Sequence, residues 1–446
     1  MPMDRLKIVL VGGGSVSWTP RIGADLLLTP ALAHAQYVLL DINQRASDLT
    51  KAYLDKLARE LQVDATFVST NRRDALAGAQ YVLITIATGG DDAHEYDLSI
   101  PERFSIYHTV GDTSGPGGWA RLIRNFDVFV SLANDINRYA PGAVVLNYTN
   151  PMTALTEVLA RVYHGPVVGL CHALFENLEL IKKCYALESE ARIAVKYAGL
   201  NHFFWTTEAK AGSVDVIADL AQRLKTRSLA EALQLPQPEA NNVFDSPRRV
   251  AEELFRQTGV LPYLGDRHTC EFFPYYITSK ANLSRYGLIR TPNRHRRRRH
   301  REEGQKLVAM IQGKIPAEYK QRTRETAADI IAAHSQGQVF IDVGNLPNIG
   351  QISNLPPGLV VETAVRVDRN GFSPLTFGAL PPIVHGFIEP YAHVFPMVVE
   401  ACFRRDKKLA LQALRLDPVC SHLNGAQVSE LGERLLGAHK RFIKAF

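Results

Sequence analysis

Cysteine and histidine stand beside other polar residues at two places where a short apolar run ends. Cys171 and His172 follow the first run, and Asn201 and His202 follow the second. Thiolate sulfur and imidazole nitrogen are ligands that suit divalent transition metals. The spacing of Cys171 and His202 does not match a zinc knuckle, so a structural zinc is not expected. A buried core thiol and a hydrogen-bonded core histidine are alternatives that the spacing leaves open.

A glycine-rich turn near the N-terminus has the pattern of a dinucleotide-binding loop. Gly12 and Gly14 match the first two glycines of G-x-G-x-x-G, and Ser17 takes the place of the third. Such a loop brings backbone N–H groups close to a pyrophosphate. Asp41 ends the next predicted strand, somewhat beyond the roughly 20 residues expected, and a carboxylate there favours NAD over NADP. A glycine turn without a ligand is the alternative. The predicted NAD-binding residues are Gly12, Gly13, Gly14, Ser15 and Asp41.

Alternating strands and helices would position these residues. Continuous apolar, β-branched runs predict strands at residues 6–11, 37–40, 81–86, 144–146 and 166–170, and helical periodicity predicts helices at 21–28, 45–61 and 122–136. Strands that are apolar along their whole length indicate a parallel sheet covered on both faces. We therefore predict an α/β fold with an N-terminal Rossmann-like, doubly wound parallel sheet. This NAD-binding domain would span residues 1–195, followed by a C-terminal α+β substrate or oligomerisation domain over 196–446.

The composition is that of a globular protein without a membrane span. The 446 residues are 46% hydrophobic and 22% charged, and no run of about 18 apolar residues occurs. The first residues do not have the pattern of a signal peptide. Five cysteines, an odd number at wide spacings, form no disulfide framework. We expect a cytoplasmic protein with no membrane partner.

The net charge of +6 comes largely from one arginine-rich run at residues 294–301. We interpret this run as the solvated face of a helix. A patch that attracts acidic saccharides is the alternative. Aromatic residues do not interleave the run, so the stacking needed for single-stranded nucleic acid is absent and no nucleic-acid partner is expected.

Several motifs together resemble one known family. They are GGGS at residues 12–15, VGDTSGPGG at 110–118, NYTNPM at 147–152, GLCH at 169–172, GLNH at 199–202 and NLPNIGQISNLP at 345–356. In this order they resemble glycoside hydrolase family 4, whose members show the GGGS form of the loop. The resemblance implies that Cys171 and His202 hold a divalent metal, usually Mn²⁺, and that NAD is bound tightly.

The resemblance also implies a reaction in which NAD is recycled, an exception to the usual two-carboxylate scheme of glycosidases. NAD⁺ would take a hydride from C3 of the sugar, and the metal would polarise the C2 hydroxyl and the new ketone. A base would then remove the C2 proton and the glycosidic oxygen would leave. Addition of water and return of the hydride would complete hydrolysis. A hydroxy-acid dehydrogenase, which would change the amount of NADH, and an NAD-sensing regulator are the rival classes.

The residue after the metal-binding cysteine separates two branches of this family. Members acting on 6-phospho sugars typically have an aspartate general acid there, whereas this chain has His172. The chain is therefore similar to the branch that acts on unphosphorylated glycosides, and closest to its α-galacturonidase-like members. An α-galactosidase or α-glucosidase of the same branch is the alternative. The saccharide substrate would then contain a uronic acid, and the resemblance implies a homodimer or homotetramer. The apolar stretch at 390–403 would serve as its interface or as core.

The Gly-Asp-Arg-His segment at residues 265–268 supplies the remaining expected site residues. By the resemblance, Asp266 is the C2 base and His172 the second catalytic residue. An ionised carboxylate near a metal suits a base, and a structural turn is the alternative. Arg267 would bind the uronate through a guanidinium fork, unless it forms a structural salt bridge. Asn150 and Asp112 complete the expected sugar-binding set. The alternative candidates for the base are Tyr263, Tyr275 and Tyr276, and those for binding the uronate are Arg103 and Arg121.

Overall fold

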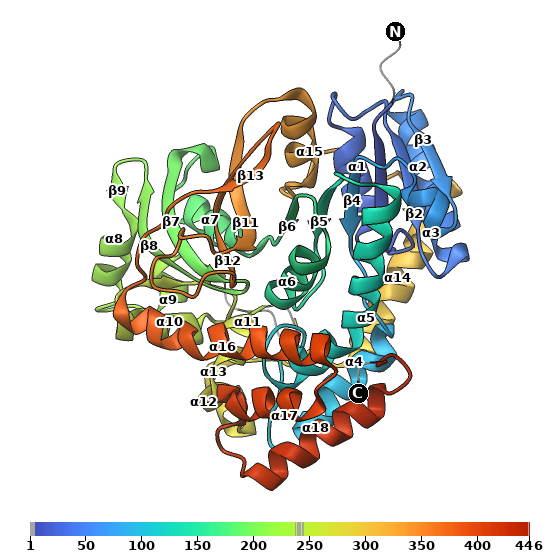
Figure 1. Ribbon diagram of the computed structural model, residues 1–446. Coiled ribbons are helices and arrows are strands. Elements are labelled where there is room, and N and C mark those ends of the chain that lie inside the picture. The colour runs from blue at the N-terminus through green and yellow to red at the C-terminus, as the bar shows by residue number, and fades with distance from the viewer. Residues whose placement is uncertain (1–4, 237, 239–241, 243–244, 445) are drawn as a thin grey trace.

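The computed structural model describes residues 5–236, 238, 242, 245–444 and 446, which form one 13-stranded sheet with helices around it (Figure 1). Six parallel strands come first in the chain: β1 (Lys7–Val11), β2 (Gln36–Leu40), β3 (Thr66–Ser69), β4 (Tyr81–Ile84), β5 (Val144–Asn147) and β6 (Val167–Gly169). Their order across the sheet is β3-β2-β1-β4-β5-β6. In β1, Val9 pairs with Val38 on one side and with Val82 on the other. The predicted Rossmann-like parallel sheet is confirmed.

Both faces of the parallel strands are buried because their side chains alternate between two hydrophobic clusters. Ile8 and Leu10 belong to one cluster, and Val9 and Val11 to the other. A strand with apolar residues at every position can serve both clusters, since successive side chains point to opposite faces. The helices that cover these faces are α1 (Thr19–Leu27), α2 (Gln44–Glu60), α3 (Arg72–Leu76), α4 (Gly90–Glu102), α5 (Gly115–Tyr139) and α6 (Met152–Val162).

The sheet continues with antiparallel strands from the second part of the chain. They are β7 (Ile193–Leu200), β8 (Phe203–Ala211), β9 (Val214–Asp215), β10 (Leu261–Pro262), β11 (Phe340–Pro347), β12 (Val360–Asp368) and β13 (Gly371–Pro374). The order onward from β6 is β11-β12-β7-β8-β10, so the sheet runs without a break past the predicted domain boundary at residue 195. At the junction, Asn345 of β11 pairs with Gly169 of β6.

Several helices follow β6 and surround the antiparallel strands. They are α7 (Ala173–Cys184), α8 (Val216–Arg223), α9 (Leu229–Ala232), α10 (Arg249–Thr258), α11 (Asp266–Thr269), α12 (Pro274–Ile277), α13 (Lys280–Tyr286), α14 (Asn293–Ile311) and α15 (Ala327–Gln336). α14 returns to the N-terminal part and contacts α2 and α4. None of the helices in the described part of the chain is long and apolar enough to cross a membrane.

Three C-terminal helices, α16 (Pro382–Arg404), α17 (Lys407–Leu416) and α18 (Gly425–His439), pack against the N-terminal part at the bottom of Figure 1. The stretch expected as interface or core is core, because α16 buries Tyr391, Val398 and Cys402 within this chain. α18 is fixed to α4 by His439, whose Nε2 lies 2.9 Å from Asp97 Oδ1. The predicted mixed fold with a C-terminal α+β part is therefore confirmed.

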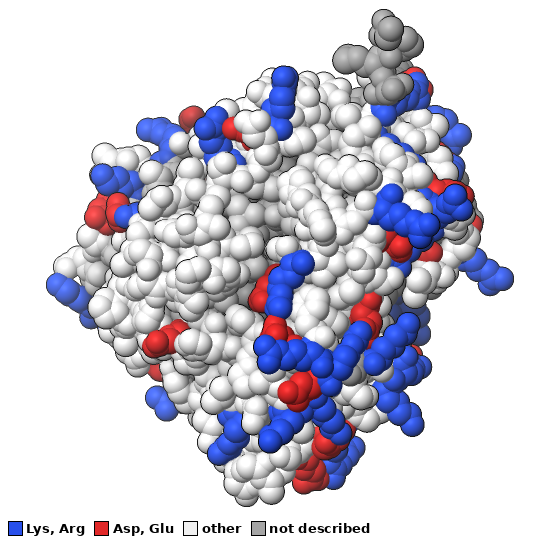
Figure 2. Space-filling view, in the orientation of Figure 1, with Lys and Arg blue, Asp and Glu red and all other residues white. Residues whose placement is uncertain are grey.

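Charged side chains are interspersed over the face shown in Figure 2. Basic side chains gather most densely at the lower right, around the C-terminal helices, with acidic side chains among them. A stretch of uncharged surface lies left of the centre of the same view, with charged side chains along its outer edge. The net positive charge is therefore not spread as one continuous basic surface on this face.

Candidate active site

The glycine turn packs so closely against the end of a neighbouring strand that its first position requires glycine. Gly12 adopts φ +91°, and a Cβ atom there would lie 2.7 Å from the carbonyl oxygen of Thr85. Asp41, at the end of β2, accepts a hydrogen bond from the Gly14 N–H at 2.9 Å. Ser15 lies in the same turn, where its Oγ accepts from the backbone of Trp18 at 3.2 Å. The loop and Asp41 are thus held together at the carboxyl edge of the parallel strands, where such sheets bind ligands.

A cluster of possible metal ligands is formed by Asp112, His202 and His268. One ligand atom from each lies within 4.8 Å of the others. They come from the loop before α5, the turn between β7 and β8, and α11. The rings of His202 and His268 have centroids 3.9 Å apart, and His202 Nδ1 lies 3.0 Å from Thr113 Oγ1. Distant parts of the chain therefore converge on one point.

The protonation states of this cluster suit a cation. Burial lowers the pKa of His202 to about 4, so its imidazole is neutral near pH 7 and keeps a lone pair. Burial by itself would raise the pKa of Asp112, but its polar neighbours, among them His268 and the guanidinium of Arg121, outweigh burial and lower that pKa overall. An ionised carboxylate with two imidazoles is a donor set that suits Mn²⁺ and similar divalent ions.

Cys171 is buried next to this region but is not one of the three clustered groups. It belongs to a hydrophobic cluster with Met152 and Tyr263, and the Tyr263 ring lies 6.1 Å from the ring of His202. The Sγ of Cys171 accepts a hydrogen bond from the backbone N–H of Ala173 at 3.4 Å. Burial and the carboxylate of Glu362 raise the pKa of this thiol.

Asp266 lies in a different environment from the one expected of a base. Its side chain is fully buried, and its carboxylate accepts hydrogen bonds from Ser246 Oγ at 2.8 Å, Val250 N at 3.2 Å and Ala251 N at 2.9 Å. Both oxygens are therefore used to hold the first turn of α10. This arrangement corresponds to the structural alternative, because a base needs an oxygen open toward the substrate.

Of the three alternative tyrosine candidates, Tyr263 lies beside the metal-ligand cluster. Its hydroxyl donates to Glu176 Oε2 at 2.9 Å, and Arg248 holds the other oxygen of Glu176 at 2.8 Å. Burial raises the pKa of Tyr263 well above its usual value. Tyr275 is 45% exposed and Tyr276 bonds to Glu253, so neither shares this position.

His172 is the first residue before α7 and faces solvent. Its side chain is 56% exposed, and its Nδ1 lies 3.5 Å from Glu325 Oε1. The ring of Trp18, which follows the glycine turn, lies 6.1 Å from the His172 ring. His172 is therefore accessible to solvent and lies within ion-pair distance of Glu325.

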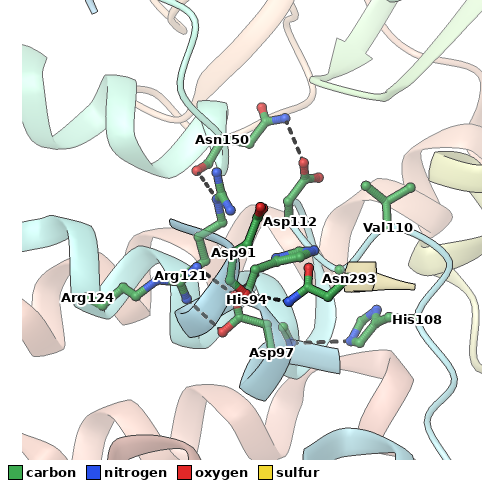
Figure 3. Close-up of polar contacts among 12 residues, drawn as sticks. Asp91, His94, Asp97, His108, Val110, Asp112, Arg121, Arg124, Asn150 and Asn293 are labelled. Atoms are coloured by element: carbon green, nitrogen blue, oxygen red, sulfur yellow. Dashed lines mark hydrogen bonds and ion pairs between the residues drawn. The ribbon is translucent and has the colours of Figure 1, made fainter. Parts of the chain in front are cut away.

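Polar contacts link the expected sugar-binding residues to the cluster (Figure 3). Asn150 Nδ2 donates to Asp112 Oδ2 at 3.5 Å, and Arg121 Nε donates to the Asn150 carbonyl at 2.9 Å. Arg267 is nearly buried and donates to Thr291 Oγ1. Arg103, by contrast, is exposed at the end of α4.

A buried glutamate holds the loop that carries Asp112. Glu271 Oε1 accepts from the N–H groups of Val110 at 2.7 Å and Gly111 at 2.9 Å, and lies 3.4 Å from His108 Nδ1. Burial opposes ionisation of Glu271, but His108 and these donors lower its pKa overall. A charged, fully bonded carboxylate thus fixes the position of Asp112.

The family model described as Family 4 glycosyl hydrolase matches residues 7–187, and the model of the C-terminal domain of the same family matches residues 197–420. The chain belongs to glycosyl hydrolase family 4. This family 4 chain is thus a glycosidase, and the rival classes of hydroxy-acid dehydrogenase and NAD-sensing regulator are not supported.

The relatives of this family 4 glycosidase cover its whole length. An alpha-galacturonidase of Bacillus subtilis (strain 168) is 32% identical over 428 residues, 94% of this chain and 94% of the relative. A Bacillus subtilis crystal structure, described as a candidate glucosidase, is 29% identical with a TM-score of 0.88 and covers 97% of this chain and 100% of its own. A Thermotoga maritima 6-phospho-beta glucosidase, solved with manganese, NAD⁺ and glucose-6-phosphate, shares the fold at 21% identity and a TM-score of 0.82, over 99% and 100% of the two chains.

Sequence reasoning placed some residues of this site and missed others. It expected His202 as a ligand and Asp112 and Asn150 at the sugar, and these three lie together. It did not assign His268 to the metal, although this histidine stands in the same Gly-Asp-Arg-His segment as Asp266. It also treated the arginine-rich run as surface, and so missed Arg296, whose guanidinium is near Asp112.

Proposed function

We propose that this family 4 glycosidase hydrolyses α-D-galacturonides, with NAD and a divalent ion such as Mn²⁺ as cofactors. The observation that carries the proposal is the Asp112–His202–His268 cluster, surrounded by arginines, in a chain whose 32%-identical relative is named alpha-galacturonidase. Such a site can bind a metal ion that contacts the sugar hydroxyls. Its arginines can bind a uronate carboxylate at the same time. The homodimer or homotetramer implied by the resemblance remains part of this proposal.

The residues of the glycine loop fit NAD. The turn is tight, because a Cβ atom at Gly12 would lie 2.7 Å from the Thr85 carbonyl oxygen and one at Gly14 would lie 2.7 Å from Ala46 Cβ. Gly12, Gly13, Gly14 and Ser15 would face the pyrophosphate, and Asp41 the adenosine ribose. Ile42, next to Asp41, is fully exposed and offers an apolar surface to the adenine ring.

The ligand cluster fits a divalent ion. We assign His202, His268 and Asp112 as ligands through two nitrogens and one oxygen, with Cys171 as the further ligand that the family resemblance implies. When bound, NAD would supply a hydride acceptor and the ion would supply Lewis acidity at the sugar hydroxyls.

Different side chains around the cluster would remove the C2 proton and protonate the leaving oxygen. Tyr263 is the better placed C2 base because its hydroxyl proton already points to a carboxylate, Glu176, that can accept it. Asp266 remains the other candidate from sequence, although its oxygens hold α10. His172, oriented by Glu325 and open to solvent, would donate the proton to the leaving oxygen. Asn150 would orient the sugar through its amide.

The test is a side-by-side assay of p-nitrophenyl α-galacturonide, α-glucuronide, α-galactoside and α-glucoside. Purified enzyme is supplied with NAD⁺, Mn²⁺ and a reductant, and kcat/KM is measured for each. We expect the galacturonide to be preferred at least tenfold over both neutral sugars. A preference for α-galactoside or α-glucoside would overturn the uronide assignment while leaving the family unaffected.

A further inference from the structure

Two residues of the arginine-rich run attach α14 to the start of α4, and others pair within α14. Arg297 pairs with Asp92 at 2.9 Å and His300 with Asp91 at 2.9 Å, both in the first turn of α4. Arg299 pairs with Glu303 one turn along α14 at 2.8 Å. These partly exposed contacts correspond to the solvated helix face expected from sequence, and each contributes little stability.

Arg296 differs from these neighbours because its side chain turns inward. Its Nη2 donates to the carbonyl oxygen of Val110 at 3.4 Å, in the loop that carries Asp112. Its Nε is buried and has no hydrogen-bond partner among the described residues. A buried N–H donor without a partner is costly, and such donors commonly mark a place where a ligand completes the contacts.

The charges near Arg296 are those of the candidate active site. Burial lowers the pKa of this guanidinium, and the strongest opposing charge is that of Asp112. Arg267 and Arg121 come from α11 and α5, and they act on the same carboxylate. Asp91 and Glu271, the other acidic groups that act on Arg296, already have His300 and His108 as partners. Three guanidiniums thus lie near the carboxylate of Asp112, so an anionic group of a substrate bound there would meet several cations.

We propose that Arg296 binds the C6 carboxylate of the uronic acid, with Arg267 and Arg121 completing the receptor. The proposal rests on the proposed function, since it names the part of the site that selects an acidic sugar. A planar guanidinium with a free Nε–H matches a carboxylate through parallel hydrogen bonds. A neutral sugar, with a hydroxymethyl group at C6, would leave the desolvated cations without a counter-charge, so it would be bound less well.

The experiment compares Arg296→Ala and Arg296→Lys with a matched control, Arg297→Ala, on the exposed side of the same helix. kcat/KM is measured for p-nitrophenyl α-galacturonide and α-galactoside. Binding of free D-galacturonate and of NAD⁺ is measured by calorimetry on the Mn²⁺-loaded enzyme. We expect Arg296→Ala to lower kcat/KM for the galacturonide about 30- to 100-fold more than for the galactoside. Galacturonate affinity should fall by a similar factor, and NAD⁺ affinity should stay within about twofold.

Arg296→Lys keeps the charge but cannot form two parallel hydrogen bonds, so it should give an intermediate loss of kcat/KM. If the alanine variant does not fold, the lysine variant tests the proposal. Equal losses on both sugars, or a selective loss of NAD⁺ affinity, would overturn the assignment of Arg296. The latter would mean that the pyrophosphate, another anion, is its ligand. If the wild-type enzyme does not prefer the galacturonide, the proposed function itself fails, whatever the variants do.

Discussion

At the scale of single residues, Asp112 takes part in both the metal-ligand cluster and the group of arginines beside it. It lies within ligand distance of His202 and His268, accepts from Asn150, and lies near three arginines. Its carboxylate is kept ionised by these cations, although burial opposes this. A divalent ion can therefore bind to the carboxylate of Asp112, while an anionic sugar binds to the arginines beside it.

His268→Ala should weaken Mn²⁺ binding about 10- to 100-fold, because one of three clustered ligand atoms is lost. Binding is measured by electron paramagnetic resonance of free Mn²⁺, which does not depend on turnover. The control is His164→Ala, at an exposed position on the surface. Unchanged Mn²⁺ affinity in the His268 variant, with a large loss in Cys171→Ser, would show that the thiol and not His268 is the essential ligand.

Tyr263→Phe and Asp266→Asn should separate catalysis from stability. We expect Tyr263→Phe to lower kcat about 100-fold and to abolish exchange of the sugar C2 hydrogen with D₂O, because the proton acceptor is removed. Asp266→Asn should instead destabilise the fold by about 1–3 kcal/mol, because at least one of the three hydrogen bonds at α10 is lost. Exchange is followed by NMR and stability by thermal melting. Loss of exchange in a stable Asp266 variant would return the role of base to that residue.

At the scale of elements, sequence predicted the strands better than the contacts between them. β1, β2 and β4 begin within one residue of the predicted positions, because a buried parallel strand is marked by its own apolar residues. α5 begins at Gly115 and not at 122, since its first turn has the sequence Gly-Pro-Gly-Gly, typical of a loop. Gly118 is needed there because a Cβ atom would lie 2.5 Å from the Thr113 carbonyl. Such close approaches depend on tertiary structure, so local sequence patterns do not predict them. The same holds for the inward direction of the Arg296 side chain.

The turn between α17 and α18 gives a pH-dependent prediction. Burial raises the pKa of Asp417 to about 6, above the usual value of about 3.9 for an aspartate. The folded state then binds the proton more tightly than the unfolded state, so stability from this group is fully present below about pH 4 and is lost as the pH rises through about 6. Asp417→Asn, which cannot ionise, should gain up to about 3 kcal/mol relative to wild type across this window.

Thermal melting at pH 4, 5, 6 and 7 measures this difference. The matched control is Asp406→Asn at the exposed N-cap of α17, where the carboxylate accepts from the Leu409 N–H at 2.9 Å. A stability difference between Asp417→Asn and wild type that does not change with pH would contradict the raised pKa.

At the scale of the whole molecule, one sheet joins the half with the glycine loop to the strands β7 and β8, whose connecting turn carries His202. The glycine loop, the loop of Asp112 and the turn after β7 all depend on this sheet for their positions. The family followed from ordered motifs spread along the chain, and the fold class from the alternation of apolar strands and helices. The composition of the metal-ligand cluster did not, because its members are brought together only by tertiary structure.

Hydrolysis by the whole enzyme should need NAD⁺ and a divalent ion without consuming NAD⁺. We expect no net formation of NADH over many turnovers, and a slower rate with substrate deuterated at C2, because the proposed reaction returns the hydride and breaks the C2–H bond. Product release and absorbance at 340 nm are followed together after dialysis against EDTA and readdition of each cofactor. Full activity of the dialysed enzyme, shown to be free of NAD and metal, would contradict this mechanism.

The pairing of β6 with β11 also has a consequence for the growing polypeptide. Gly169 and Asn345, which pair at the junction, are 176 residues apart. At roughly 5–20 residues per second, a ribosome needs about 10 to 35 s to make the second strand after the first. During that time the newly made half carries an unpaired strand edge, which favours association with other chains. Production of the first half alone is therefore expected to yield aggregates, and slower translation should increase the need for chaperones.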